Sequence, residues 1–246
     1  MVDIKSAYPA AMRDYHPTDS GYTNQRTIPK DPKKARCSFY HIHGYSRGAL
    51  PKRLETGGIS FEHQGGEFWA TGHELLAGLE TGTLDIWRIV NVKVPNRLIR
   101  FSDFVDQNYG EKLEAEKAGN ATARLHAKLI MNSGYGKFAA NPEKYADYLI
   151  APIGSMAPLH DGYTLELTEF GDHWLWARPI DPDSPAARYF DVATAASITG
   201  WVRAFMWRSI QAVERPIYCD TDSILCESTG ALILGDALGE WELEAD

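Results

Sequence analysis

Apolar and polar residues are distributed along the chain in a way that predicts a mixture of strands and helices. Alternating or clustered apolar runs predict strands over residues 2–5, 36–43 and 84–94. Residues 7–13 are expected to form a turn or a helix, and helices are predicted over residues 72–80, 102–118, 121–139 and 191–213. Because strands and helices follow one another without strict alternation, the predicted fold class is α+β, with antiparallel sheet and packed helices.

Turn-forming residues separate these elements. Residues 14–34 are rich in Pro, Asp, Lys and Gly and are expected to form a loop. The run Gln64-Gly65-Gly66 lies between short apolar segments at 59–63 and 67–69, which predicts a hairpin. Residues 141–188 are rich in Pro, Gly and aromatic residues, which predicts a β-rich excursion, and residues 216–226 predict a strand, a turn and a second strand.

Composition narrows the class of protein. The chain has 246 residues, of which 44% are hydrophobic and 24% charged, as in globular proteins. No apolar run approaches the ~18–20 residues that span a bilayer, and no apolar segment near Met1 indicates a secretory signal. The cysteines are too few and too irregular for a disulfide framework or a cysteine zinc site: Cys37, Cys219 and Cys226. A reducing, cytoplasmic location is therefore expected.

The net charge of −8 is unevenly distributed. Residues 220–246 hold eight acids and no Lys or Arg, whereas residues 13–53 hold nine Lys and Arg against three acids. This asymmetry is compatible with a polyanion contact at one end and a carboxylate site at the other. Charge alone favours an ordinary solvated surface.

Two carboxylates stand at the bend of the strand–turn–strand segment. Apolar residues lead up to Asp220-Thr221-Asp222 and resume directly after it at Ser223-Ile224-Leu225. No cationic residue lies close in sequence to offset the cost of burying these charges, so a divalent metal is a natural partner. A simple β-turn is the alternative, because Asp and Ser are turn formers.

A third carboxylate, Asp3, ends the first predicted strand. If this strand lies beside residues 216–220, Asp3 faces Asp222, and the pair could hold two metal ions for phosphoryl transfer. Tyr8 follows, where a ring packed against C2′ of a sugar would exclude a 2′-hydroxyl. A core aromatic is the alternative interpretation of Tyr8.

One face of the predicted helix at 121–139 combines cations, an amide and an aromatic ring. At 100° per residue, its members fall within an arc of about 80°: Arg124, Lys128, Asn132 and Tyr135. Such a face could contact phosphates, a sugar and a base. A solvated helix face is the alternative, although it explains Asn132 and Tyr135 less well.

These three segments together resemble motifs A, B and C of the family B DNA polymerases, in that order. Asp3-Ile4-Lys5-Ser6-Ala7-Tyr8-Pro9 resembles motif A, Lys128 to Gly136 (Lys-x-x-x-Asn-Ser-x-Tyr-Gly) resembles motif B, and Tyr218-Cys219-Asp220-Thr221-Asp222-Ser223 resembles motif C. The amino-acid sequence over residues 127–142, 217–224 and 238–241 is most similar to that of the protein-primed, bacteriophage-type branch.

The resemblance implies a role for each matched residue. Asp3 and Asp222 would hold two Mg²⁺ ions (Mn²⁺ could substitute), with Asp220 close by and the Ile4 carbonyl as a further ligand. Tyr8 would exclude ribonucleotides, Arg124 and Lys128 would bind the triphosphate, and Asn132 and Tyr135 would line the base-pair pocket. The remaining residues would contact DNA on the template or primer side: Ser6, Ser133, Gly136, Thr199, Arg203, Tyr218 and Ser223.

The resemblance also implies an arrangement of domains. Residues 1–13 would belong to the palm, 14–98 to the palm with an insertion like the terminal-protein region, 99–140 to the fingers, 141–188 to a β-rich hairpin insertion, and 189–246 to the palm. No segment of this chain matches the exonuclease domain or the thumb of relatives. Gly134 departs from the motif, since relatives have a larger apolar residue there.

The resemblance thus implies a DNA-directed DNA polymerase, as a fragment or subunit of a split enzyme for phage-type DNA replication in a bacterial host. Its expected partners are primer–template DNA and deoxynucleoside triphosphates (dNTPs), together with a terminal protein and separate chains supplying exonuclease and thumb. One alternative is a non-catalytic subunit that binds DNA or completes a split polymerase, which an exposed apolar edge near Val2 and after Trp241 would favour. Another is a two-metal phosphohydrolase, although a nuclease has no need of the Lys128 to Tyr135 face.

Overall fold

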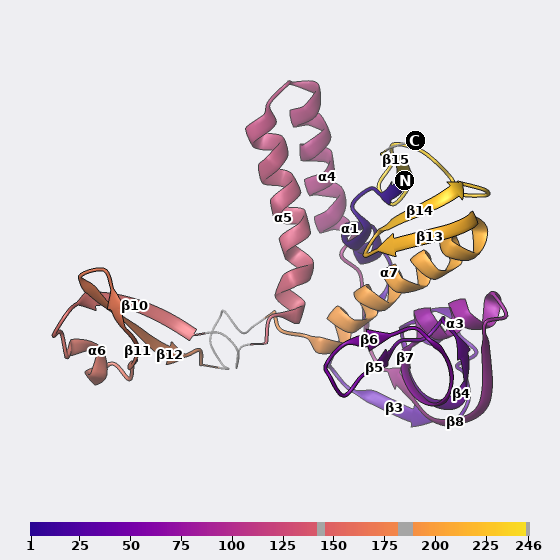
Figure 1. Ribbon diagram of the computed structural model, residues 1–246, viewed down its shortest axis with the longest axis horizontal. Coiled ribbons are helices and arrows are strands. Elements are labelled where there is room, and N and C mark those ends of the chain that lie inside the picture. The colour runs from indigo at the N-terminus through magenta and orange to yellow at the C-terminus, as the bar shows by residue number, and fades with distance from the viewer. Residues whose placement is uncertain (142–145, 182–188, 245–246) are drawn as a thin grey trace. The chain divides into compact units, whose positions relative to one another are not determined.

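The computed structural model describes residues 1–141, 146–181 and 189–244, and the chain divides into two units (Figure 1). The first unit comprises residues 1–135 and 191–246, and the second comprises residues 136–190. Helices and antiparallel sheets occur in both units, which confirms the predicted α+β class.

The first unit contains a small sheet built from both ends of the chain. Its strand order is β13-β14-β1-β15, formed by β13 (Glu214–Asp220), β14 (Ser223–Ser228), β1 (Val2–Ile4) and β15 (Trp241–Leu243). Strand β1 is therefore an inner strand, antiparallel to both of its neighbours. Its alternation places Val2 and Ile4 in the core, at 0% and 1% exposed, with Asp3 between them on the other face.

A second, larger sheet has the order β3-β8-β4-β7. Its strands are β3 (Tyr22–Gln25), β8 (Leu84–Pro95), β4 (Phe39–Arg47) and β7 (His63–Thr71). One face packs against α3 (Gly72–Glu80) around a core that includes Tyr40, Ile42, Phe68 and Leu75. Two-stranded pairs accompany this sheet: β2 (His16–Pro17) with β9 (Leu98–Ile99), and β5 (Lys52–Arg53) with β6 (Ile59–Ser60).

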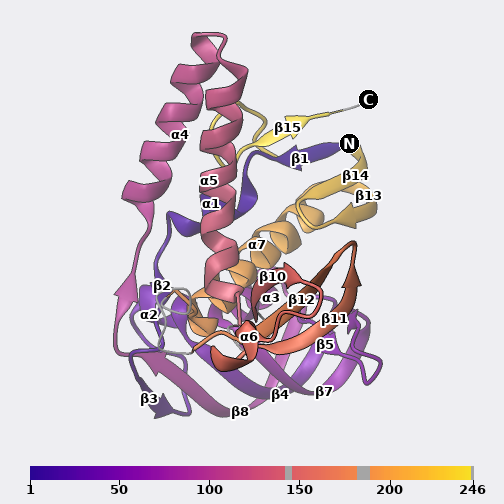
Figure 2. The same ribbon diagram turned by 90° about the vertical axis from the view of Figure 1, so that its left-hand side faces the viewer.

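Helix α7 (Val192–Ala212) passes between the two sheets, as Figures 1 and 2 both show. The Asp191 side chain begins the helix by accepting a hydrogen bond from the Thr194 amide at 2.8 Å. Small buried residues, including Ala193, Ala195 and Gly200, allow neighbouring elements to approach closely. Helix α7 contacts α3 on one side and α1 (Ala7–Met12) on another.

Two long helices form an antiparallel pair in Figures 1 and 2: α4 (Ser102–Lys117) and α5 (Ala121–Ala139). The Asn120 side chain accepts a hydrogen bond from the Ala123 amide at the start of α5. Gly134 of α5 lies against α1 and α4, since a Cβ there would be 3.0 Å from the Phe104 ring and 3.4 Å from the Met12 methyl. This close approach explains a small residue where relatives are expected to have a larger one.

The second unit is built around a three-stranded antiparallel sheet of order β10-β12-β11. Its elements are β10 (Ala146–Pro152), the short helix α6 (Ala157–His160), β11 (Thr164–Phe170) and β12 (His173–Pro179). The β-rich character predicted for residues 141–188 is present, although residues 142–145 and 182–188 lie outside the described residues.

Four structural expectations are wrong: the loop at 14–34, the start of the strand at 36–43, the hairpin at 64–66 and the neighbour of the first strand. Helix α2 (Pro32–Cys37) occupies the end of the predicted loop 14–34 and the start of the predicted strand 36–43, because Asp31 caps its N-terminus and Pro32 suits its first turn. That loop also contains β2 and β3. No hairpin turns at Gln64-Gly65-Gly66, since β7 runs through these residues and pairs with β4. The first strand lies beside β14 and β15 rather than beside residues 216–220.

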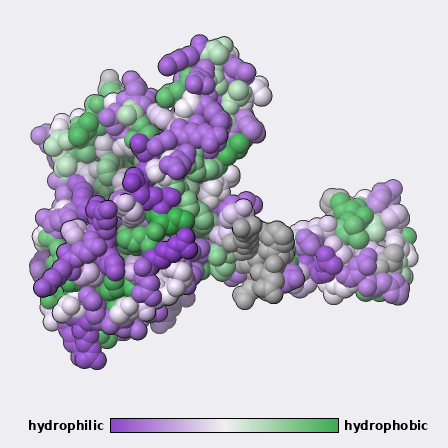
Figure 3. Space-filling view, turned by 180° about the vertical axis from the view of Figure 1, so that it is seen from behind, coloured by the Kyte–Doolittle hydropathy of each residue, from purple (hydrophilic) through white to green (hydrophobic). Residues whose placement is uncertain are grey.

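Apolar residues on the face shown in Figure 3 form small separate patches among hydrophilic ones. Within the described residues, no helix has both the length and the apolar character needed to cross a membrane.

Replacing Gly200 with Ala is expected to lower the free energy of unfolding by about 1–3 kcal/mol. A Cβ at this position would lie 2.1 Å from Thr71 Oγ1, which caps α3 and is held by Glu74. Gly110→Ala is the matched control: Gly110 also lies within a helix, with no atom within 4 Å of its added Cβ, so this change should stabilise by up to about 1 kcal/mol. Urea unfolding of both variants tests the close approach, and an unchanged Gly200→Ala protein would contradict it.

Candidate active site

The first candidate aspartate, Asp3, is brought beside the Asp220-Thr221-Asp222 turn by the pairing of β1 with β14. The Ile4 amide donates a hydrogen bond to the Asp222 carbonyl at 2.9 Å, and Asp3 lies opposite Ser223 in the register. The prediction that Asp3 faces Asp222 is thus met through a different neighbouring strand.

Unusual backbone conformations adjoin these aspartates. Three non-glycine residues of the described chain have a positive φ, and two of them are Ser6, with φ 54°, and Thr221, with φ 52°. Thr221 makes the bend between Asp220 and Asp222, while Ser6 reverses the chain between β1 and α1. Left-handed non-glycine residues are strained and gather at functional sites, so their position supports a functional assignment.

The electrostatics of the site disfavour ionised carboxylates. Burial, together with the charges of Asp222, Glu244 and Glu242, raises the pKa of Asp3 from 3.8 to about 6. Burial and the charges of Asp220 and Glu244 also raise the pKa of Asp222. Within the described part of the chain, Asp3, Asp220 and Asp222 form no ion pair with Lys or Arg. The site therefore has an unbalanced negative charge that a cation could neutralise.

Glu242 and Glu244 were not identified from the sequence. Glu242 pairs with Asp3 in the β1–β15 register, and the Glu244 amide donates to the Met1 carbonyl. The alternation Trp241-Glu242-Leu243-Glu244 was an available strand signal, but its partner strand could not be predicted.

Tyr8 and Tyr135 form an aromatic stack beside the aspartates. Their ring centroids are 4.4 Å apart with an interplanar angle of 21°, and the Tyr135 hydroxyl is hydrogen-bonded to Thr199 Oγ1 at 2.9 Å. Burial, Tyr135 and the charge of Asp222 raise the pKa of Tyr8, while the charge of Arg203 opposes this. The structure thus brings Tyr8, Tyr135 and Thr199 together close to Asp222.

Basic side chains of α4 and α5 lie near one another on the same pair of helices. Burial and then the charges of Lys128, Arg124 and Lys5 lower the pKa of Lys112. Arg124, Lys128 and Asn132 are exposed on α5. Lys112 was not selected from the sequence, where it was one of several charges on a predicted helix.

Several other predicted residues have partners of their own. The Arg203 guanidinium donates to buried Glu74 at 2.6 Å, so it also links α7 to α3. Ser133 donates to the Ile130 carbonyl, and Ser223 donates to the Asp220 carbonyl. Tyr218 is 63% exposed on β13, whereas Gly136 falls in the second unit.

The three aspartates do not gather as tightly as a preformed three-ligand site. Among the described residues, only His41, His43 and Glu67 place three ligand atoms within 4.8 Å of one another. Asp3 and Asp222 are neighbours, since the charge of Asp222 acts on Asp3. The three carboxylates of Asp3, Asp220 and Asp222, however, are not all within 4.8 Å of one another.

Comparison with known proteins decides the family. Residues 1–224 match the model of the family described as DNA polymerase type B, organellar and viral. The chain belongs to this family. Its membership confirms the resemblance of the three motifs to family B polymerases.

Phage polymerases are among the relatives of this family B chain. It is 38% identical over 246 residues to the DNA-directed DNA polymerase of Enterobacteria phage PRD1, covering 99% of this chain and 42% of that protein. It is 28% identical over 236 residues to the DNA polymerase of Bacillus phage phi29, covering 90% and 37%. The chain thus spans less than half the length of these relatives.

Solved structures show the same fold. An orthorhombic crystal form of phi29 DNA polymerase matches with a TM-score of 0.63 and 22% identity, over 99% of this chain and 42% of that one. The phi29 enzyme complexed with primer–template DNA also matches with a TM-score of 0.63 and 22% identity, over 98% and 41%.

Replacing Asp3 with Asn is expected to raise the free energy of unfolding at neutral pH in a metal-free buffer. Because the pKa of Asp3 is raised to about 6 in the folded state, the folded protein binds more protons than the unfolded chain between about pH 4 and 6. The free energy of unfolding of the wild type therefore falls as the pH rises through this window. The variant, which has no carboxylate at position 3, should not show the part of this decrease that comes from ionising Asp3. Thermal unfolding across the window measures the difference.

Asp236→Asn provides a control of opposite sign. Its hydrogen bond with Lys5 lowers the pKa of Asp236, so this exposed carboxylate stabilises the folded state above its ordinary pKa. Its removal should lower stability slightly at neutral pH, with the difference vanishing in acid. Equal pH profiles for wild type and Asp3→Asn would contradict the raised pKa of Asp3.

Proposed function

We propose that this chain carries the nucleotidyl-transfer site of a DNA-directed DNA polymerase, joining a dNTP to a primer 3′-hydroxyl. The observation that carries the proposal is the juxtaposition of Asp3 on β1 with Asp222 in the turn before β14, with no cationic side chain paired to either among the described residues. Membership of the polymerase family supports it.

The donor set fits a divalent metal. Carboxylates whose pKa is raised by burial and by neighbouring carboxylates, without an ion-paired Lys or Arg, are what a hard cation such as Mg²⁺ or Mn²⁺ neutralises. In the proposed enzyme, Asp3 and Asp222 hold two such ions, with Asp220 and the Ile4 carbonyl nearby. When bound, the ions lower the pKa of the primer hydroxyl and stabilise negative charge on the phosphates.

The remaining side chains would position the substrates. Arg124 and Lys128 bind the triphosphate, and their charge stabilises the pyrophosphate as it leaves. Lys112 lies close enough to both for their charges to affect its pKa, so it joins this basic surface. Asn132 and Tyr135 would line the base-pair pocket, next to the ring of Tyr8 that stacks on Tyr135.

DNA contacts remain part of the same proposal. Seven residues are proposed to contact the primer or the template strand: Ser6, Ser133, Gly136, Thr199, Arg203, Tyr218 and Ser223. Thr199 is supported by its bond to Tyr135. Arg203 is engaged by Glu74, so its proposed DNA contact uses the part of the guanidinium that this pair leaves open. Residues 14–98 are still proposed to belong to the palm with an insertion like the terminal-protein region, and residues 141–188 to a β-rich hairpin insertion. A terminal protein and chains that carry exonuclease and thumb remain proposed partners.

The alternative of a non-catalytic subunit keeps one observation in its favour. It expects an exposed apolar edge near Val2 and after Trp241, and Met1 is 40% exposed while Leu243 is 49% exposed on the edge strand β15. A partner chain would have to dock there. A phosphohydrolase accounts for the aspartates but not for the Tyr8–Tyr135 stack.

Primer extension on a short labelled template with dNTPs and Mg²⁺ or Mn²⁺ tests the proposal. Asp222→Asn is expected to reduce extension by at least about 100-fold, since it removes a charge used in the transition state. The variant should fold, because the change relieves repulsion at a carboxylate whose pKa is raised. Asp161→Asn, at an exposed position in the second unit, is the matched control and should extend normally.

Mn²⁺ binding followed by electron paramagnetic resonance gives a readout that needs no turnover. Wild type and Asp161→Asn should bind Mn²⁺ in the presence of a dNTP, while Asp3→Asn and Asp222→Asn should not. Equal Mn²⁺ binding by all four proteins would contradict the metal site, and extension unaffected by Asp222→Asn would contradict the catalytic assignment.

Replacing Tyr8 with Ala is expected to relax sugar discrimination. Without the ring, a 2′-hydroxyl would no longer be excluded, and ribonucleotide use relative to dNTP use should rise roughly tenfold or more. Tyr8→Phe keeps the ring and its stack on Tyr135, so it should discriminate like wild type. The ratio of kcat/KM values for a ribonucleotide and its deoxy counterpart measures this, and equal ratios for Ala and Phe would refute the role.

A further inference from the structure

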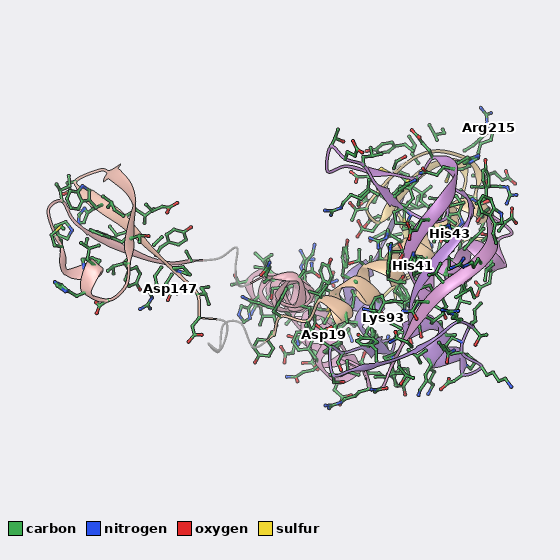
Figure 4. All side chains as sticks on the ribbon, turned by 90° about the horizontal axis from the view of Figure 1, so that it is seen from below. Asp19, His41, His43, Lys93, Asp147 and Arg215 are labelled. Atoms are coloured by element: carbon green, nitrogen blue, oxygen red, sulfur yellow. The ribbon has the colours of Figure 1, made fainter. Side chains whose placement is uncertain are left out.

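A cluster of metal-ligating side chains lies on the larger sheet of the first unit, on residues to which the proposed polymerase chemistry gives no role. His41 and His43 are on β4 and Glu67 is on β7, and one ligand atom from each lies within 4.8 Å of the others. Figure 4 shows His41 and His43 next to each other on this sheet. Because they are two residues apart on a strand, their imidazoles share one face.

The sheet register holds the three ligands together. In the β4–β7 ladder, His43 lies directly opposite Glu67, and His41 lies opposite Trp69. Strand β4 is bonded on both sides, to the edge strand β7 and to β8; its pairing with β7 is regular past both histidines, whereas its pairing with β8 shifts register beside His41 and His43. Ligands on strands of a sheet can be held more precisely than ligands on loops.

Neighbouring groups also orient one of the imidazoles. The His41 ring stacks on Trp69 with centroids 4.0 Å apart and an interplanar angle of 12°. Its Nε2 contacts the Glu67 carboxylate. The His41 side chain is 15% exposed and that of Glu67 is 54% exposed, so a metal ion could reach the ligands from solvent.

The donor chemistry selects the metal. Two imidazoles with one carboxylate suit Zn²⁺ and related transition metals, whereas Mg²⁺ prefers oxygen ligands alone. Three protein ligands leave the fourth tetrahedral position for water or another donor, as in open zinc sites. A simple cross-strand ion pair would need only His41 and Glu67 and gives no reason for His43 to join them.

We propose that His41, His43 and Glu67 form a Zn²⁺ site on the face of the β3-β8-β4-β7 sheet. The site is built from residues other than the aspartates of the candidate active site and does not depend on the proposed polymerase activity. A bound ion would join β4 to β7 and so stabilise this sheet.

Titration of the chelator-treated full chain with Zn²⁺ against a chromophoric competitor tests the site. Wild type should bind one tight Zn²⁺ per chain at this site. Loss of even an outer partner of a metal ligand weakens binding roughly 10–100-fold, so loss of a ligand in His41→Ala, His43→Ala or Glu67→Gln should weaken it about 100-fold or more. Co²⁺ in place of Zn²⁺ should give the absorption bands of a tetrahedral site with nitrogen ligands.

Two control variants separate this site from other carboxylate or histidine sites. His173→Ala removes an exposed histidine that contacts Asp172 at 2.6 Å without a second histidine beside it, and should bind Zn²⁺ like wild type. Asp222→Asn should also keep the Co²⁺ bands, since it alters only the aspartate site.

Thermal unfolding gives a second, independent readout. Zn²⁺ should raise the Tm of wild type and both controls but not that of the ligand variants, because binding to the folded state alone is stabilising. Each variant is compared with itself with and without Zn²⁺, so that a change in Tm caused by losing the side chain itself, such as the His41–Trp69 stack, does not enter the comparison. Undiminished Zn²⁺ binding by a His41→Ala/His43→Ala double variant, or no tight binding by wild type, would overturn the proposal.

Discussion

The pairing of β1 with β14 is the constraint on which the candidate site depends. The hydrogen bond from the Ile4 amide to the Asp222 carbonyl joins two ends of the chain in one sheet. A register shift of one residue would turn Asp3 into the core and Val2 and Ile4 to the other face. The apolar residues that occupy the core here prevent this shift: Val2, Ile4, Ile224 and Trp241 are at most 2% exposed.

The same pairing has an electrostatic cost. Asp3 is partly buried and lies near Asp222, Glu244 and Glu242, and its ionised form is disfavoured as a result. Two strained residues, Ser6 and Thr221, hold the adjoining turns. Burial of apolar side chains on one face of this sheet offsets the cost of charge and strain on the other. Such a site is most stable with its negative charge neutralised, which is the condition that metal binding would create.

Helix α7 links this small sheet to the larger one. Its small residues let α3 approach until Thr71 and Gly200 are in close contact, and the Arg203–Glu74 pair fixes the same junction. Thr199, one turn before Arg203, reaches the Tyr135 hydroxyl. The aromatic stack beside the aspartates is thus held by a helix that also contacts α3 and strand β7 of the larger sheet, so packing far from Asp3 affects the geometry around it.

The sequence by itself determined the long helices, the strand–turn–strand at Asp220 to Ser223 and the family, because these depend on local periodicity and on short motifs. It did not determine which strands are neighbours: β1 was expected beside residues 216–220 and lies between β14 and β15. It also missed α2, where capping by Asp31 outweighed a strand-like alternation, and the contribution of Glu242, Glu244 and Lys112. Strand order, register and the meeting of charges from distant segments depend on which apolar faces pack together, so only the tertiary structure decided them.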